Sequence, residues 1–93
     1  MFFVYVLYSP AFGKHYTGFT ADLEQRLLAH NQFSKKGWTV RFRPWIILHT
    51  ESFSLKNEAM KREKQLKSGQ GRLFIKNLIK QKILNQSSFP AFL

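Results

Sequence analysis

The sequence predicts a small α/β (α+β) domain in which helices flank a three-stranded, mostly antiparallel sheet, in the order ββαβαα. Three observations support this prediction. Short runs rich in phenylalanine, valine, tyrosine and isoleucine are typical of strands. Two later stretches place apolar residues at helical spacing. The 93 residues leave room for one core, so we expect a single domain over residues 1–84 and a C-terminal tail over 85–93.

Residues 2–8 begin the predicted sheet, because aromatic and β-branched residues dominate a run that is too short for a helix. A serine, a proline and a glycine interrupt this run, and residues 15–19 then complete a hairpin. Thr20 is the expected N-cap of a first helix over residues 21–32, whose first turn carries acids that suit the helix dipole.

A polar, basic segment follows this helix, and we interpret it as a long loop with a short strand-like piece at residues 39–42. Residues 45–50 (WIILHT) form a third, buried strand. Ser54 is expected to cap a second helix that continues to Lys67, and a third helix is predicted over residues 72–84. The remaining tail contains the segment FPAFL.

The charge of the chain indicates a polyanionic partner. Fifteen basic residues against five acidic ones give a net charge of +10, which favours nucleic acid; a ribosome-associated or merely solubilising charge is the alternative. The absence of cysteine excludes disulfides and thiolate zinc sites. The apolar N-terminal run lacks a basic leader and is too short to span a bilayer, so we expect a cytoplasmic protein with no membrane contact.

Three groups able to act on a phosphate fall on neighbouring elements. Tyr5 and Tyr16 lie on the two strands of the hairpin, and Arg26 lies on the helix that follows. Arginine suits a multidentate grip on phosphate oxygens, and Gly18 permits a tight turn or a close ligand approach. Each residue also has an ordinary explanation, since tyrosines pack well in strands and Arg26 could pair with Asp22 one turn earlier. Only their combination favours a functional site.

The order and spacing of these motifs resemble the GIY-YIG endonuclease domain, over roughly residues 2–80. The small stand-alone bacterial members related to the nuclease domain of the UvrC excision-repair subunit look most similar. The matching segments are FVY with Tyr5, YTG with Tyr16, DLEQRL with Arg26, HN at His30 and Asn31, and NEAMKREKQLK with Glu58. The resemblance implies the GIY-YIG fold and a metal-dependent hydrolysis of phosphodiester bonds, of a repair or structure-selective type, in DNA in preference to RNA.

The resemblance also implies a role for each matched residue. Tyr16 resembles the tyrosine that activates the attacking water, and Tyr5 the tyrosine that supports the site by hydrogen bonding. Arg26 resembles the catalytic arginine, and Glu58 the single carboxylate that holds Mg²⁺ or Mn²⁺. His30 matches a position that lines the active site in several members.

Two assignments stay open at this point. A phenol with an ordinary pKa near 10 is mostly protonated at neutral pH, so the general base is Tyr16 or, as a rival, His30. One carboxylate is sufficient for Mg²⁺, which keeps waters and substrate phosphate as its other ligands. Glu58 is the first choice for that carboxylate, Glu63 further along the same helix competes with it, and Glu51 is a third candidate.

The chain departs from the family pattern at two positions. The first motif is FVY where the family name has GIY, and its tyrosine is kept. Phe19 follows Gly18 at the position where the UvrC type carries a lysine. Lys14 and Lys67 are candidates to replace that lysine.

Basic residues elsewhere suit contacts with the phosphates of a nucleic acid. Trp38 lies among several of them and could either stack on an unpaired base or cover the edge of the sheet. The second functional hypothesis is a non-catalytic or partner-dependent binding module that keeps the fold. We expect the domain either to recognise nucleic-acid structure or single strands, or to rely on a separate protein partner for targeting. The residues expected to bind nucleic acid are Lys14, Lys35, Lys36, Trp38, Arg41, Arg43, Lys67 and Arg72.

Overall fold

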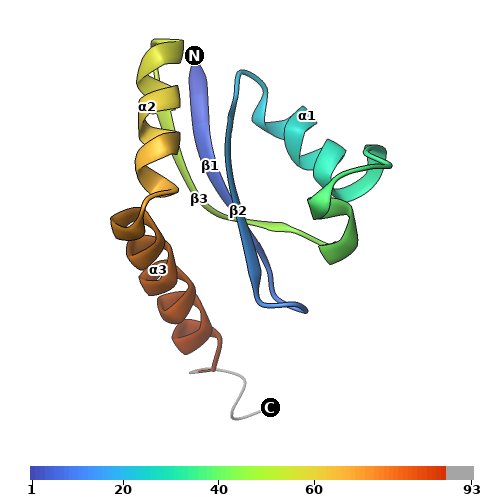
Figure 1. The fold of residues 1–93 in the computed structure, drawn as a ribbon. Coiled ribbons are helices and arrows are strands. Elements are labelled where there is room, and N and C mark those ends of the chain that lie inside the picture. Colours follow the sequence, from blue (N-terminus) through green and yellow to red (C-terminus); the bar gives the residue numbers. More distant parts are fainter. Residues whose placement is uncertain (88–93) are drawn as a thin grey trace.

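A three-stranded sheet lies between two layers of helices in the computed structural model, which describes residues 1–87 (Figure 1). The strands are β1 (Phe2–Ser9), β2 (Lys14–Thr20) and β3 (Ile46–Phe53). Their order in the sheet is β2-β1-β3, and both pairings are antiparallel. The predicted fold class and the order of strands and helices are therefore confirmed.

The helices divide between the two faces of this sheet. On one face lie α1 (Leu23–Leu28), the π-helical turn η1 (Ala29–Phe33) and the 3₁₀ helix η2 (Trp38–Phe42). On the other lie α2 (Lys56–Leu66) and α3 (Gly69–Ser87), as Figure 1 shows. Two helical layers around one sheet mean that β1, the central strand, is covered on both sides.

Burial along β1 follows from this arrangement, because successive side chains of a strand point to opposite faces. Val4 and Val6 are fully buried against α2 and α3, whereas Tyr5 and Leu7 are buried on the face of α1, η1 and η2. A strand that is covered on both sides has to be apolar throughout, and this accounts for the unbroken apolar run at the start of the sequence.

The start of the first helix differs from the prediction by two residues. Asp22 is the N-cap, with its carboxylate accepting a hydrogen bond of 3.1 Å from the Gln25 N–H. The Thr20 hydroxyl accepts instead from the N–H of Asp22 at 3.1 Å. Thr20 therefore stabilises the turn before the helix. Asp22 is the N-cap because its side chain can reach a free N–H group of the first turn.

The segment predicted to hold a short strand-like piece forms η2 instead. A strand there would have separated Trp38 from Phe42, but the helical turn brings their rings to 4.8 Å. The indole N–H of Trp45 also donates to the Thr39 carbonyl at 2.8 Å. Packing of aromatic rings on the buried Trp45 therefore decides the local conformation.

The third strand continues to Phe53, three residues further than predicted, and an ion pair ties this end to α2. The Arg62 guanidinium donates to the Glu51 carboxylate at 2.9 Å, and His49 contacts the same carboxylate at 2.7 Å. Burial by itself would raise the pKa of Glu51, but the hydrogen bonds from Arg62 and His49 lower it overall. The Glu51 carboxylate, the third candidate for the metal ligand, is therefore occupied by a structural ion pair.

The two long helices also have boundaries other than those predicted. Leu55 occupies the N-cap position of α2 without a side-chain hydrogen bond, so Ser54 does not cap it. The next helix spans Gly69–Ser87, longer at both ends than residues 72–84, and the rest of the tail lies outside the described residues. Within residues 1–87, no helix has both the length and the apolar character needed to cross a membrane.

Candidate active site

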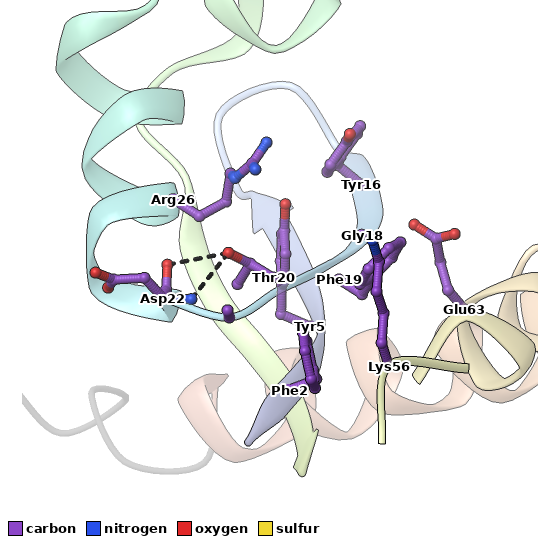
Figure 2. Close-up of a pocket in the computed structure, with 11 residues that line it drawn as sticks. Phe2, Tyr5, Tyr16, Gly18, Phe19, Thr20, Asp22, Arg26, Lys56 and Glu63 are labelled. Carbon is purple, nitrogen blue, oxygen red and sulfur yellow. Dashed lines mark hydrogen bonds between the residues drawn. The ribbon is translucent and has the colours of Figure 1, made fainter. Parts of the chain in front are cut away.

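A hollow of about 580 Å³ lies at the outer edge of β2, where the two helical layers meet. Figure 2 shows the side chains that line it, drawn from β1, β2, α1 and α2. It brings together Tyr5, Tyr16 and Arg26, three of the residues singled out in the sequence. The lining residues with ionisable side chains are Tyr5, Tyr16, Asp22, Arg26, Lys56 and Glu63.

Gly18 makes room for the phenol of Tyr5. The two residues are directly opposite each other in the register of β1 and β2. A Cβ at position 18 would lie 2.6 Å from the Tyr5 hydroxyl oxygen and 2.8 Å from Cζ, closer than real contacts allow. The glycine of the YTG motif is therefore required by the ring across the strand pair.

A chain of buried hydrogen bonds holds Tyr5 in place. Its hydroxyl lies 3.1 Å from Nε2 of His30, and Nδ1 of the same imidazole lies 2.9 Å from the Thr39 hydroxyl. These contacts connect β1 to η1 and η2 through the middle of one core. Both ring nitrogens of His30 are thus engaged by other side chains.

The protonation states of this chain follow from burial. Burial is the main cause that raises the pKa of Tyr5 far above its ordinary value, and the nearby Tyr16 adds to it. Burial also lowers the pKa of His30, with further contributions from the cations of Arg26 and Arg43. At neutral pH the phenol and the imidazole are both uncharged. The phenol of Tyr5 does not readily release a proton, and the imidazole of His30 does not readily gain one.

Tyr16 is the tyrosine that faces the hollow with a free hydroxyl. Its ring packs 4.8 Å from that of His30 and 6.3 Å from that of Tyr5, measured between centroids. Within the described part of the chain, no side chain or backbone group bonds the Tyr16 hydroxyl. The oxygen is therefore available to a molecule bound in the hollow.

Arg26 projects from α1 into the same hollow (Figure 2). Asp22 caps the helix, and no ion pair forms between Asp22 and Arg26. Among residues 1–87, the Arg26 guanidinium has no carboxylate or carbonyl partner. A guanidinium without a partner in a lined hollow is suited to bind an anion.

Two acidic residues line this hollow: Asp22, whose carboxylate caps α1, and Glu63. The Glu63 carboxylate is the one on α2. Figure 2 shows it approaching from α2, on the opposite side from Arg26. Its side chain is 21% exposed, and Lys67 Nζ lies 3.5 Å from it. Glu58, the first choice from the sequence, is exposed elsewhere on α2 and does not line the hollow. The structure therefore brings Glu63 to the site and leaves Glu58 outside it.

The donor set around the hollow fits a hydrated divalent cation. No group of three or more histidine, cysteine or acidic side chains that could hold a metal occurs within residues 1–87. Mg²⁺ needs only one or two carboxylates when waters and substrate phosphate complete its shell. Glu63 supplies one partly exposed carboxylate, which is sufficient for that mode of binding.

Lys56 is a lining residue that the motif comparison did not single out. It is the first residue of α2 and contributes an ammonium to a hollow that Phe19 also lines. Lys14, by contrast, lies over the Phe42 ring at 5.6 Å, away from the site. Only the packing of α2 against β2 identifies Lys56, because its sequence position lies far from both tyrosines.

The other residues expected to bind nucleic acid are divided between two places. Lys67 and Arg72 line a smaller hollow that adjoins Tyr16. Lys35, Lys36, Trp38 and Arg41 line a separate hollow beside η2. Arg43 instead donates hydrogen bonds to the carbonyls of Ala29, His30 and Ser34. Its guanidinium therefore stabilises η1 and is not directed outward.

Fold and site together define a class of protein. Two tyrosines on a hairpin, an arginine on the next helix and one glutamate on α2 surround a single hollow. The family model described as the GIY-YIG catalytic domain matches residues 1–77. The chain belongs to the GIY-YIG family, a family of nucleases, and the resemblance found in the motifs is confirmed.

Within that class, the similar proteins carry the name UPF0213. A UPF0213 protein of Halobacterium salinarum is 42% identical over 55 residues, which cover 59% of this chain and 71% of the relative. One from Staphylococcus haemolyticus is 40% identical over 53 residues, covering 57% of this chain and 65% of the relative. The solution structure of a UPF0213 protein from Bacillus halodurans is 30% identical, with a TM-score of 0.49 over 84% of this chain and 85% of that one.

Proposed function

We propose that this protein is a metal-dependent endonuclease that hydrolyses phosphodiester bonds in nucleic acid, with DNA as the preferred substrate. The observation that carries the proposal is the convergence of Tyr16, Arg26 and Glu63 on one hollow from three different elements. Two of these groups, the Tyr16 hydroxyl and the Arg26 guanidinium, have no partner among the described residues. Side chains with free polar groups around one hollow are typical of a binding site.

Arg26 binds the scissile phosphate in this proposal. Its guanidinium donates to the non-bridging oxygens and stabilises the negative charge that grows on them in the transition state. Lys56, from the opposite layer, adds a second cation at the same hollow. It is our candidate to replace the lysine that is absent at Phe19.

Tyr16 acts as the general base. Tyr16 takes part in its phenolate form: as the water oxygen forms a bond to phosphorus, the water proton moves to the phenolate oxygen and the bond from phosphorus to the leaving 3′-oxygen breaks with its electron pair. The 3′-oxygen takes a proton from solvent water, and Tyr16 releases its proton to solvent before the next turnover. His30 is less suited to this role, because both of its nitrogens are engaged by Tyr5 and Thr39. His30 instead positions the Tyr5 phenol, which packs beside Tyr16.

Glu63 is the residue that would hold Mg²⁺ or Mn²⁺. When bound, such an ion supplies charge neutralisation at the phosphoryl oxygens. The Lys67 ammonium lies 3.5 Å from this carboxylate, and both side chains stay partly exposed. Glu58 has no comparable place in this mechanism.

The test is cleavage of labelled single-stranded, duplex and branched DNA and of RNA, with Mg²⁺, Mn²⁺ or EDTA. We expect metal-dependent cutting that falls at least about a hundredfold in Tyr16→Phe, Arg26→Ala and Glu63→Gln. Glu58→Gln is the matched control, since it changes the other glutamate of α2, and it should keep native activity.

Two outcomes would change the proposal. If Glu58→Gln abolishes cutting and Glu63→Gln does not, the metal-binding role returns to Glu58. If the native chain binds nucleic acid in a salt-sensitive way but never cuts, and the three substitutions leave binding unchanged, the protein is a binding module that keeps the fold. The net charge of +10 is the observation that favours this second function.

A further inference from the structure

We propose that Trp38 is a stacking site for an unpaired nucleobase, and that Lys35, Lys36 and Arg41 bind the phosphates next to that base. The substrate would then carry a single-stranded segment close to the bond that is cut. This inference rests on the proposed function and deepens it, because it names the class of nucleic acid that the protein takes.

The indole of Trp38 is rigidly supported and still accessible. It packs on Phe42 at 4.8 Å and on Trp45 at 5.8 Å between ring centroids, and 46% of it stays exposed. Trp45 is itself 2% exposed and is fixed by its hydrogen bond to the Thr39 carbonyl. Trp45 is therefore the tryptophan that is buried against the sheet, whereas Trp38 remains an exposed aromatic surface supported by it.

The hollow beside Trp38 has the chemistry of a nucleotide site. Its volume is about 580 Å³, within the range of about 300–1,000 Å³ found for small-molecule pockets. Three cations and one large aromatic ring line it, with no acidic residue among them. Cations next to an exposed aromatic ring are the combination that binds single-stranded nucleic acid, by phosphate contact and base stacking. The lining residues are Lys35, Lys36, Gly37, Trp38, Val40 and Arg41.

Two hydrogen bonds connect this surface to the active site. Thr39, the neighbour of Trp38, is bonded to His30, and His30 is bonded to Tyr5 in the catalytic hollow. A strand held at Trp38 is therefore fixed relative to the site. The bases of a duplex stack on one another and offer no free face, so this contact selects a segment that is unpaired.

The experiment measures affinity without cleavage, using a labelled 12-nucleotide single-stranded DNA and the matched duplex in EDTA. Trp38→Ala should weaken binding of the single strand by roughly ten- to a hundredfold, with little change for the duplex. The dependence on salt should stay native in Trp38→Ala, because stacking releases no counterions, and should become shallower in Lys35→Ala/Lys36→Ala. Phe33→Ala is the matched control, since Phe33 is 58% exposed on η1 but lies outside this hollow.

Tryptophan fluorescence gives a second measurement that does not depend on affinity. Binding of the single strand should quench the native chain, and the quenching should disappear in Trp38→Phe, in which only the buried Trp45 remains. If the native chain binds and cuts nucleic acid but Trp38→Ala alters neither single-strand nor duplex binding, or alters both equally, this inference is overturned and the proposed function stands. A native chain that neither binds nor cuts any nucleic acid overturns both.

Discussion

Tyr5 is the residue on which the geometry of the candidate site depends most. Its ring occupies the space beside Gly18, and its hydroxyl forms a buried hydrogen bond with the imidazole of His30. We predict that Gly18→Ala displaces the ring, breaks this hydrogen bond and lowers the free energy of unfolding by about 1–3 kcal/mol. Urea unfolding of the variant measures the loss, and its cleavage rate should fall as well. Native stability in this variant would show that the strand pair has room for a Cβ.

The buried imidazole of His30 makes stability depend on pH. Burial, with Arg26 and Arg43, lowers its pKa in the folded state, so the unfolded chain binds the proton more readily. The stabilising contribution is therefore complete above the ordinary pKa of about 6.5 and is lost as the pH falls through the lower folded pKa.

Urea unfolding at pH 7.5 and pH 5.5 should accordingly show a less stable protein at the lower pH. His30→Gln should reduce that difference, because it removes the proton-binding group. His15→Gln provides the comparison, since burial, Arg72 and Lys76 lower the pKa of His15 in the same direction. If His30→Gln leaves the difference unchanged, another group is responsible.

The choice between the two glutamates shows what the sequence could reveal about the site. At 100° per residue, Glu63 lies about 40° from the buried Ala59 on the helix surface, and Glu58 about 100° from it on the other side. Leu66, also buried, falls on the same stripe as Ala59. The glutamate next to the buried stripe, Glu63, is the one that can reach the hollow beside β2. Helix geometry therefore favoured Glu63, and motif spacing alone did not use that information.

At the scale of elements, the backbones of α2 and α3 approach each other closely at their junction. A Cβ at Gly71 would lie 2.3 Å from the Gln65 carbonyl oxygen and from the Leu66 Cα, atoms that no rotamer change can move away. Gly71→Ala should therefore lower the free energy of unfolding by about 3 kcal/mol or more.

Gly69 provides the matched control for this prediction. It lies two residues earlier in α3, where an added Cβ meets nothing within 4 Å. Gly69→Ala should leave stability unchanged or raise it by up to about 1 kcal/mol, through helix propensity. Thermal unfolding of both variants tests the pair, and equal effects at the two positions would contradict the packing argument.

Elements defined by their own sequence were predicted well, and elements defined by distant contacts were not. β1 and the first half of β3 are short apolar runs, and the turn residues Ser9, Pro10 and Gly13 mark the entry into β2, so local composition identifies all three strands. The turns η1 and η2 depend on other parts of the chain: Arg43 donates to carbonyls of η1, and Trp45 bonds the backbone of η2. No local pattern encodes those bonds, so the sequence predicted a helix continuing to residue 32 through most of η1, and a loop with a strand-like piece where η2 forms.

At the scale of the whole molecule, the charge of +10 governs association with nucleic acid. Cations line the hollow at Tyr16 and Arg26, the smaller hollow next to it and the surface at Trp38. With about 0.7 counterions released per phosphate of a single strand, contacts with three or more phosphates should weaken binding about tenfold or more between 50 and 200 mM salt. A titration of affinity against salt measures this slope, and a flat response would argue against phosphate contacts.

The hollow lined by Tyr16, Arg26 and Glu63 lies between the two helical layers, and this position has a mechanical consequence. Arg26 and Glu63 belong to helices that lie on opposite sides of the sheet (Figure 1). A substrate phosphate bound by Arg26, beside a cation that Glu63 would hold, would link the two helical layers, which are otherwise connected through the strands of the sheet. Substrate would then restrain the opening of the domain itself, slowing amide hydrogen exchange in α1 and α2 together, including in backbone segments that the nucleic acid never touches.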